Sequence, residues 1–194
     1  MTVQTEHSRD MAFISQARFR ALMNAFARPG TIVTVTCPNA PRPLAEATAG
    51  VLECLCDFET PVWLAPSLET SSAVVEWVRF RTGSPVGPAA EASFAVVSDK
   101  DHFPDLDIFT SGSADYPDRS TTVLIQIEDF DGKPYAISGP GIQQNRSFSA
   151  ASLPPDFIAR MTRNRWLYPR GVDVLLVSGD RLLALPRSVH IQEA

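Results

Sequence analysis

The stretch PRGVDVLLVSGDRLLALPR, residues 169–187, indicates the fold more strongly than any other part of the chain. Two apolar runs, 172–177 and 182–185, flank a Ser-Gly-Asp turn, where Gly and Asp tolerate the positive φ that a tight reversal needs. The first run is almost free of polar residues, which is typical of a strand covered on both faces. Pro169 and Pro186 border the pair where neither removes a ladder hydrogen bond from its interior. These features predict a central hairpin in a buried sheet.

Before this hairpin, helical and strand patterns alternate along the chain. Residues 1–12 are polar and are expected to be flexible. Helical spacing of apolar residues and runs of β-branched residues predict the order helix 15–28, strand 31–36, helix 44–57, strand 62–64, helix 68–81 and strand 93–98. This alternation predicts an α/β fold in which some strands pair in parallel.

The second half of the chain is richer in strands. A polar loop over 99–119 precedes a predicted strand over 121–128, and Asp131-Gly132 then predicts a hairpin that returns in a strand over 135–138. Pro154-Pro155 opens a predicted helix that continues to about residue 163. Because no change of composition divides the chain, we expect a single domain over residues 1–194: a three-layer α/β/α architecture with one mixed sheet.

Composition narrows the class of protein. The chain is 44% hydrophobic and 20% charged, as expected of an ordinary globular protein, and has no apolar run of membrane-spanning length. The polar N-terminus lacks the apolar core of a signal peptide, so we expect a cytoplasmic location and no membrane partner. The three cysteines, Cys37, Cys54 and Cys56, and the scattered histidines do not have metal-ligand spacing, so no metal is expected and the cysteines are interpreted as small hydrophobic residues.

Charge is unevenly distributed. The whole chain has a formal charge of −5, yet residues 160–194 hold six arginines against three acidic residues. An acidic body with an arginine-rich end favours an acidic partner or a phosphorylated ligand. A nucleic-acid partner is not expected, because the basic face is small and lacks aromatic platforms. Arg160, Arg163 and Arg165 close a predicted helix, where cations also complement the helix dipole.

The segment Ser138-Gly139-Pro140-Gly141-Ile142 allows two interpretations. Its clustered backbone N–H groups are able to hold a phosphate, although the Lys-Ser/Thr of a Walker loop is missing and Pro140 removes one donor. The other interpretation is a tight exit from a strand.

Two other kinds of site are disfavoured. A Ser-His-Asp hydrolase site is not expected, because no Gly-x-Ser-x-Gly elbow is present. A calcium site is not expected in the acidic loop around His102, because the spacing of a calcium-binding loop is missing.

Seven short segments, spread over about nine-tenths of the chain, resemble sequences of the PhnH family. Members of this family are subunits of the bacterial carbon–phosphorus (C–P) lyase core complex of phosphonate metabolism. The segments are Phe19-Arg20-x-Leu22 through Pro29-Gly30, Thr60-Pro61-Val62-Trp63-Leu64, Arg79-Phe80-x-Thr82, Ser93-Phe94-Ala95-Val96, Ser138-Gly139-x-Gly141-Ile142, Pro169-x-Gly171-Val172-Asp173, and Leu182 to Arg187 with His190. The threonine pair that usually follows Pro-Arg in the family is Ser188-Val189 here.

The resemblance implies a homodimer with a fold similar to the pyridoxal-phosphate (PLP)-dependent transferases but without PLP. The residues support the lack of that cofactor, since PLP enzymes need a lysine in a pocket that lowers its pKa. The chain has only Lys100, between two aspartates, and Lys133, after an Asp-Gly turn, and both are typical of solvated loops. No cofactor is therefore expected.

The resemblance also implies partners, namely the G, I and J subunits. It implies a requirement for this chain, with G, I and the ATPase-like L subunit, when ribose alkylphosphonate triphosphate forms from ATP and an alkylphosphonate. It assigns no catalytic residue, so the first hypothesis is a non-catalytic assembly subunit. The alternative is direct binding of phosphonate or ATP phosphates, assisted electrostatically by Arg146, Arg170 and Arg187 with the Gly139 and Gly141 turn.

Overall fold

A computed structural model describes residues 2–194, with side chains from residue 12 onward. It has a mixed α/β fold built on a six-stranded sheet in the order β1-β8-β7-β4-β3-β2. Its strands are β1 Val33–Thr34, β2 Val62–Leu64, β3 Phe94–Val97, β4 Thr122–Gln126, β7 Asp173–Ser178 and β8 Arg181–Leu185. The strands β2, β3, β4 and β7 are parallel, and β8 and β1 continue the sheet in antiparallel pairing.

The predicted central hairpin is confirmed. Strands β7 and β8 pair with Val177 opposite Leu182, and Gly179 in the turn has a φ of 59°. β7 alternates between the faces: Leu175 packs into the core on one side of the sheet and Leu176 into the core on the other. Since both faces are covered, an unbroken apolar run is what this strand requires.

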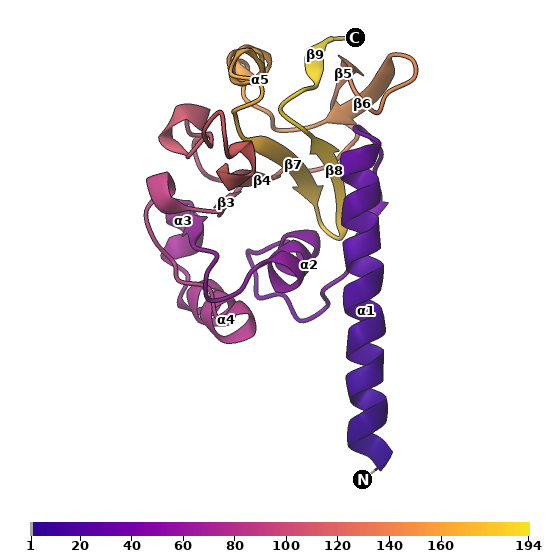
Figure 1. Cartoon of the computed structure of the whole chain (residues 1–194), viewed down its shortest axis with the longest axis vertical. Helices are drawn as coiled ribbons and strands as arrows, with labels where there is room; N and C mark the ends of the chain where they lie inside the picture. The colour runs from indigo at the N-terminus through magenta and orange to yellow at the C-terminus, as the bar shows by residue number, and fades with distance from the viewer. Residues whose placement is uncertain (1) are drawn as a thin grey trace.

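One face of the sheet is covered by helices. These are α1 Thr2–Ala27, α2 Glu46–Leu55, α3 Pro66–Glu69 and α4 Ser72–Thr82. Leu22 of α1 and Val51 of α2 pack on the β7–β8 side, while Val74 of α4 packs towards β2 and β3. Figure 1 shows α2, α3 and α4 together on this face, with α1 running along the side of the molecule.

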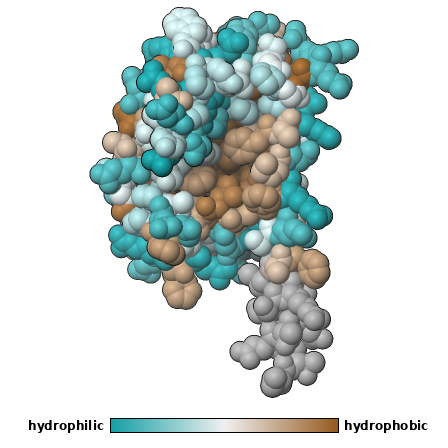
Figure 2. Space-filling model, in the orientation of Figure 1, coloured by the Kyte–Doolittle hydropathy of each residue, from teal (hydrophilic) through white to brown (hydrophobic). Residues whose placement is uncertain are grey.

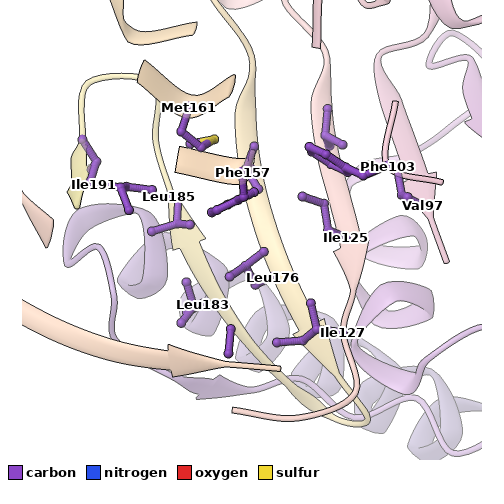
Figure 3. Close-up of a cluster of buried hydrophobic side chains, with 14 of the residues drawn as sticks. Val97, Phe103, Ile125, Ile127, Phe157, Met161, Leu176, Leu183, Leu185 and Ile191 are labelled. Atoms are coloured by element: carbon purple, nitrogen blue, oxygen red, sulfur yellow. The ribbon is translucent and has the colours of Figure 1, made fainter. Parts of the chain in front are cut away.

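The opposite face is covered by α5 Phe157–Trp166 and by a second, three-stranded antiparallel sheet. Its order is β6-β5-β9, with β5 Lys133–Ser138, β6 Arg146–Ala150 and β9 His190–Glu193. Figure 3 shows Phe157 and Met161 of α5 lying over Leu176 and Leu185 in the core of this face. The layer is therefore part helix and part sheet.

The second sheet corrects two predictions. The predicted hairpin between 121–128 and 135–138 is wrong, because β4 is already paired on both sides, with β3 and β7. β5 instead crosses to the other layer and pairs with β6 and β9, so the prediction of one mixed sheet is also wrong. Sequence reasoning missed β6 and β9.

Smaller differences lie at the ends of elements. The strand predicted over 31–36 is reduced to the two residues of β1, and the helix predicted over 68–81 is divided into α3 and α4. Residues 1–12 were expected to be flexible, and the helix was expected from residue 15, but the backbone belongs to α1 from Thr2. The side chains of residues 1–11 lie outside the described residues. Across the described helices, none combines the length and the apolar character that crossing a bilayer would need.

Candidate functional site

Arg187, one of the three arginines predicted to bind phosphate, is held inside the molecule. Its Nε and Nη2 donate to the two oxygens of Asp173, at 3.1 and 2.6 Å, and its backbone N–H donates to the same carboxylate at 2.8 Å. Its Nη1 donates to the carbonyl of Pro117 at 2.8 Å. The side chain is 13% exposed. Because bidentate, charge-assisted bonds of this kind are strong, a phosphate at Arg187 would have to displace a carboxylate.

Gly139 and Gly141 lie together in the turn after β5. Gly141 has a φ of 80°, and a Cβ at this position would lie 2.5 Å from the carbonyl oxygen of Ala27 at the end of α1. A Cβ on Gly139 would lie 3.2 Å from the carbonyl oxygen of Ser188. Close packing against backbone explains both glycines. The C-terminal end of a helix presents partial negative charge, so this end of α1 disfavours a phosphate at the turn.

Arg146 opens β6 and lies in the same neighbourhood. Its Nη1 donates to the hydroxyl of Thr31 and, at 3.5 Å, to the carbonyl of Pro29. It therefore ties β6 to the segment that follows α1. The structure brings Arg146 close to the glycine turn, since both contact the end of α1, but Arg187 points elsewhere.

The end of α5 and the turn after it form an exposed basic and aromatic surface, called the α5 turn below. Trp166 is 77% exposed and Tyr168 is 64% exposed. The α5 turn comprises Arg163, Arg165, Trp166, Leu167, Tyr168 and Arg170. Large exposed aromatic residues beside arginines are characteristic of protein interfaces.

The α5 turn is rigidly attached to the sheet. Asn164 is buried and donates from Nδ2 to the carbonyl of Val172 at 2.8 Å, while its Oδ1 accepts from the N–H of Val172 at 2.9 Å. Gly171, with a φ of 118°, allows this approach, because a Cβ there would lie 2.8 Å from Asn164 Oδ1. Arg160 does not contribute to the surface, since it is buried and paired with Asp156 and Asp105 at 2.7 and 2.9 Å.

A shallow depression joins the glycine turn to the α5 turn. It has a volume of about 320 Å³ and is lined by Pro140, Arg165, Tyr168 and Ser188. Arg165 donates from Nε to the carbonyl of Ser188 at 3.3 Å. The structure thus places the predicted glycines beside the basic surface through Pro140, whereas Arg170 lies farther along the same exposed turn.

A second cleft lies where the parallel strands end, the usual position for ligands in α/β sheets. It measures about 560 Å³, and Figure 2 shows a hollow with apolar residues beside α2 on this side of the molecule. Two N–H groups at the start of α2 are already bonded: that of the N-cap residue Ala45 donates to Gln126 Oε1 at 2.7 Å, and that of Ala47 to the Gly179 carbonyl at 2.9 Å. These two bonds reduce the number of donors that this helix end offers a phosphate.

Neither lysine has the environment of a Schiff-base lysine. Lys100 is exposed at the rim of the second cleft. Lys133 forms a 2.5 Å ion pair with Glu193 on the surface, and the hydrogen bond to that carboxylate raises the pKa of Lys133. A Schiff-base lysine needs the opposite shift, so the lysines present do not fit PLP.

The described side chains offer neither a group of metal ligands nor a reactive thiol. Within residues 12–194, no three His, Cys, Asp or Glu side chains are grouped as metal ligands. Burial raises the pKa of Cys56 to about 12, and it also raises the pKa of Cys37 and Cys54. Protonated thiols are poor nucleophiles and poor ligands, which agrees with the interpretation of these cysteines as small hydrophobic residues.

Sequence reasoning missed a cluster of three charged side chains among the helices α1, α2 and α4. Glu53 of α2 accepts from Arg18 of α1 and from Arg81 of α4. The three residues are 28 and 35 positions apart in pairs, and no spacing in the sequence connects them. Only the packing of α1, α2 and α4 brings them together.

Comparison with known proteins then decides the family. A family model described as "Bacterial phosphonate metabolism protein (PhnH)" matches residues 7–192. The chain belongs to the PhnH family. The PhnH protein of Rhizobium meliloti (strain 1021), named alpha-D-ribose 1-methylphosphonate 5-triphosphate synthase subunit PhnH, is 39% identical over 186 residues, covering 94% of this chain and 92% of that protein. HtxG of Stutzerimonas stutzeri, provisionally named a C–P lyase subunit, is 28% identical over 181 residues, covering 91% of this chain and 85% of that protein. The resemblance drawn from the sequence is confirmed.

Proposed function

We propose that this PhnH-family chain is a non-catalytic assembly subunit of a C–P lyase core complex. It would be needed with the G, I and L subunits to form ribose alkylphosphonate triphosphate from ATP and an alkylphosphonate. The observation that carries the proposal is the near full-length match to a relative named as a subunit of the methylphosphonate triphosphate synthase. The internal role of Arg187 supports it, because the strongest predicted phosphate ligand already has an anionic partner.

The α5 turn is the surface that we propose for docking a partner subunit. Its exposed Trp166 and Tyr168 supply apolar contact area, and its arginines supply bidentate donors to acidic residues. We propose the G, I and J subunits as partners, a homodimer for the isolated chain, and a cytoplasmic location. We further propose that residues 1–194 act as one domain related to the PLP-dependent transferase fold, with the six-stranded sheet as the shared element.

Affinity capture tests this proposal. The tagged chain is co-expressed with the G, I and J subunits, and the captured proteins are identified by mass. We expect the wild-type chain to retain partners, and the Trp166→Ser/Tyr168→Ser variant to lose at least one of them. Phe58→Ser is the matched control, since Phe58 is an equally exposed aromatic residue outside the α5 turn. Equal capture by all three chains would reject the α5 turn, and capture of no partner would reject the assembly function.

Direct phosphate binding at the α5 turn is the second candidate function, favoured by the exposure of Arg170 on the turn whose Arg165 lines the depression. Arg170, with Arg146 near the glycine turn, would then assist the transfer electrostatically, whereas Arg187 stays paired with Asp173. If so, ATP or methylphosphonate at a hundredfold excess over Kd should stabilise the isolated chain by about 2.7 kcal/mol. Arg170→Gln should remove that stabilisation. Ligand stabilisation that is unchanged in Arg170→Gln would reject this candidate.

A further inference from the structure

Arg18, Glu53 and Arg81 line a cleft that lies away from the α5 turn, between α1, α2 and α4. Arg18 Nη1 lies 2.5 Å from Glu53 Oε2, and Arg18 Nε donates to the carbonyl of Thr36 at 2.9 Å. Arg81 binds the other carboxylate oxygen from Nε at 2.9 Å and from Nη2. The side chains of Arg18 and Glu53 are only 12% and 13% exposed. The two guanidinium groups are thus fixed in place by a shared carboxylate.

This arrangement leaves positive charge and hydrogen-bond donors unused. Two arginines on one carboxylate give a local charge of +1, and a guanidinium carries five N–H donors. Within the part of the chain whose side chains are described, Arg18 Nη2 and Arg81 Nη1 donate to no protein acceptor. Both arginines line the cleft. An additional oxyanion would therefore find donors from two directions.

The walls of the cleft define what else a ligand must carry. The cleft has a volume of about 350 Å³, within the range of small-molecule sites. Ile14 and Trp77 form apolar walls beside the arginines, and Ile14 is 43% exposed. Trp77 also belongs to the exposed face of α4, so the apolar wall extends out of the cleft. A fully hydrated ion would leave these walls unused.

We propose that this cleft binds a small organic oxyanion, a carboxylate or phosphonate that carries a short apolar group. The anionic oxygens would accept from Arg18 and Arg81, and the apolar group would lie against Trp77 and Ile14. This inference goes beyond the assembly function, which needs no ligand. It also concerns arginines other than those of the second candidate function.

Glu53 has two opposing effects on such a ligand. Its carboxylate orients both guanidinium groups, which lowers the cost of ordering them when the ligand binds. It also repels the ligand at short range. Glu53→Gln keeps an acceptor for the arginines but raises the local charge to +2, so this variant should bind an oxyanion more tightly. A purely structural role for the cluster predicts no such gain.

Isothermal titration calorimetry on the full chain tests the proposal, with inorganic phosphate, methylphosphonate and propylphosphonate as probes. Each added methylene should tighten binding by up to about fourfold, because about 0.8 kcal/mol accompanies the burial of a CH₂ group. Arg81→Gln should weaken propylphosphonate binding by about tenfold or more, since it removes a charge-assisted donor. Arg79→Gln is the matched control, because Arg79 is exposed on the same helix and does not line the cleft.

The pattern across variants decides the outcome. The proposal requires weaker binding in Arg81→Gln, tighter binding in Glu53→Gln, and unchanged binding in Arg79→Gln. Thermal melts without ligand check that each variant folds, and Arg81→Gln should fold because the Arg18–Glu53 pair remains. No binding to the wild-type chain at millimolar concentration, or equal binding by Arg79→Gln and Arg81→Gln, would overturn it. Affinity capture of partners is a separate readout, so either proposal can fail alone.

Discussion

The Arg187–Asp173 pair offers a direct test of whether Arg187 is structural. Arg187→Met removes the side-chain donors to Asp173 and to the Pro117 carbonyl, while keeping the apolar stem of the side chain and the backbone N–H that donates to Asp173. Asp173→Asn leaves the guanidinium with hydrogen bonds but without its counter-charge. The pair links the start of β7 to the end of β8 and to the loop before β4. Its loss should therefore loosen the central part of the six-stranded sheet.

The expected magnitude follows from burial. Removing one partner of a fully buried pair costs about 3–5 kcal/mol, because the other charge is left uncompensated. Here the two side chains are 13% and 20% exposed, so water partly compensates the charge that remains. We expect Arg187→Met to lower the free energy of unfolding by about 3 kcal/mol and Asp173→Asn by about 2 kcal/mol. The double variant should lose less than the sum of the two, since the interaction is removed only once.

Urea denaturation followed by circular dichroism measures these differences. Arg170→Met is the matched control, because Arg170 is exposed on the same turn and should change stability by no more than about 0.5 kcal/mol. If Arg187→Met is as stable as Arg170→Met, or if the two single changes add without coupling, Arg187 is not the structural link described here.

Three further predictions concern other parts of the molecule. Gly141→Ala should destabilise the chain by at least about 1–2 kcal/mol in urea denaturation, because of its positive φ and the contact with the Ala27 carbonyl, whereas Gly87→Ala, with open space around its Cβ, should be nearly neutral; equal stabilities would contradict the packing role. Burial alone would raise the pKa of Glu53, but Arg81 and Arg18 outweigh it and hold the pKa below its usual 4.5. The stabilisation from ionised Glu53 should therefore be complete above pH 4.5 and decline as the pH falls through the lowered pKa, so melts of wild type and Glu53→Gln should converge in acid, and a constant difference would refute this. Because burial raises the pKa of all three thiols, they should react with a disulfide reagent at pH 8 far more slowly in the native chain than in urea. A thiol that reacts equally fast in the native and the denatured chain would contradict its burial.

The elements that could be predicted from the sequence are those whose pattern is local. The β7–β8 hairpin has its turn residues and apolar runs in one segment, and the segment of α2 is rich in Ala and Leu with little charge. The start of α5 likewise follows its prolines within a few residues. Each of these signals depends on neighbours in the chain, so no knowledge of the tertiary structure is needed.

The elements that could not be predicted depend on distant partners. Asp131-Gly132 has the sequence of a hairpin turn, but β4 is occupied on both sides by parallel neighbours, and β5 must pair elsewhere. β6 is short and polar on its exposed side, which leaves little pattern to recognise. The Arg18–Glu53–Arg81 cluster gives no local signal at all, because three separate helices contribute one residue each.

The candidate site shows the same division. An arginine-rich end was visible in the sequence, and the structure divides it into paired residues such as Arg160 and Arg187 and exposed residues such as Arg165 and Arg170. Charge patterning reports that cations are present. Which of them already has a carboxylate partner is a property of the fold.

The mass of the assembled particle tests the central claim most directly. Native mass spectrometry of the chain purified with the G, I and J subunits should give one particle that contains this chain in fixed stoichiometry. The chain alone should form no product from ATP and methylphosphonate. A chain that remains unassociated in the presence of all three subunits, or that turns over these substrates by itself, would contradict a non-catalytic assembly role.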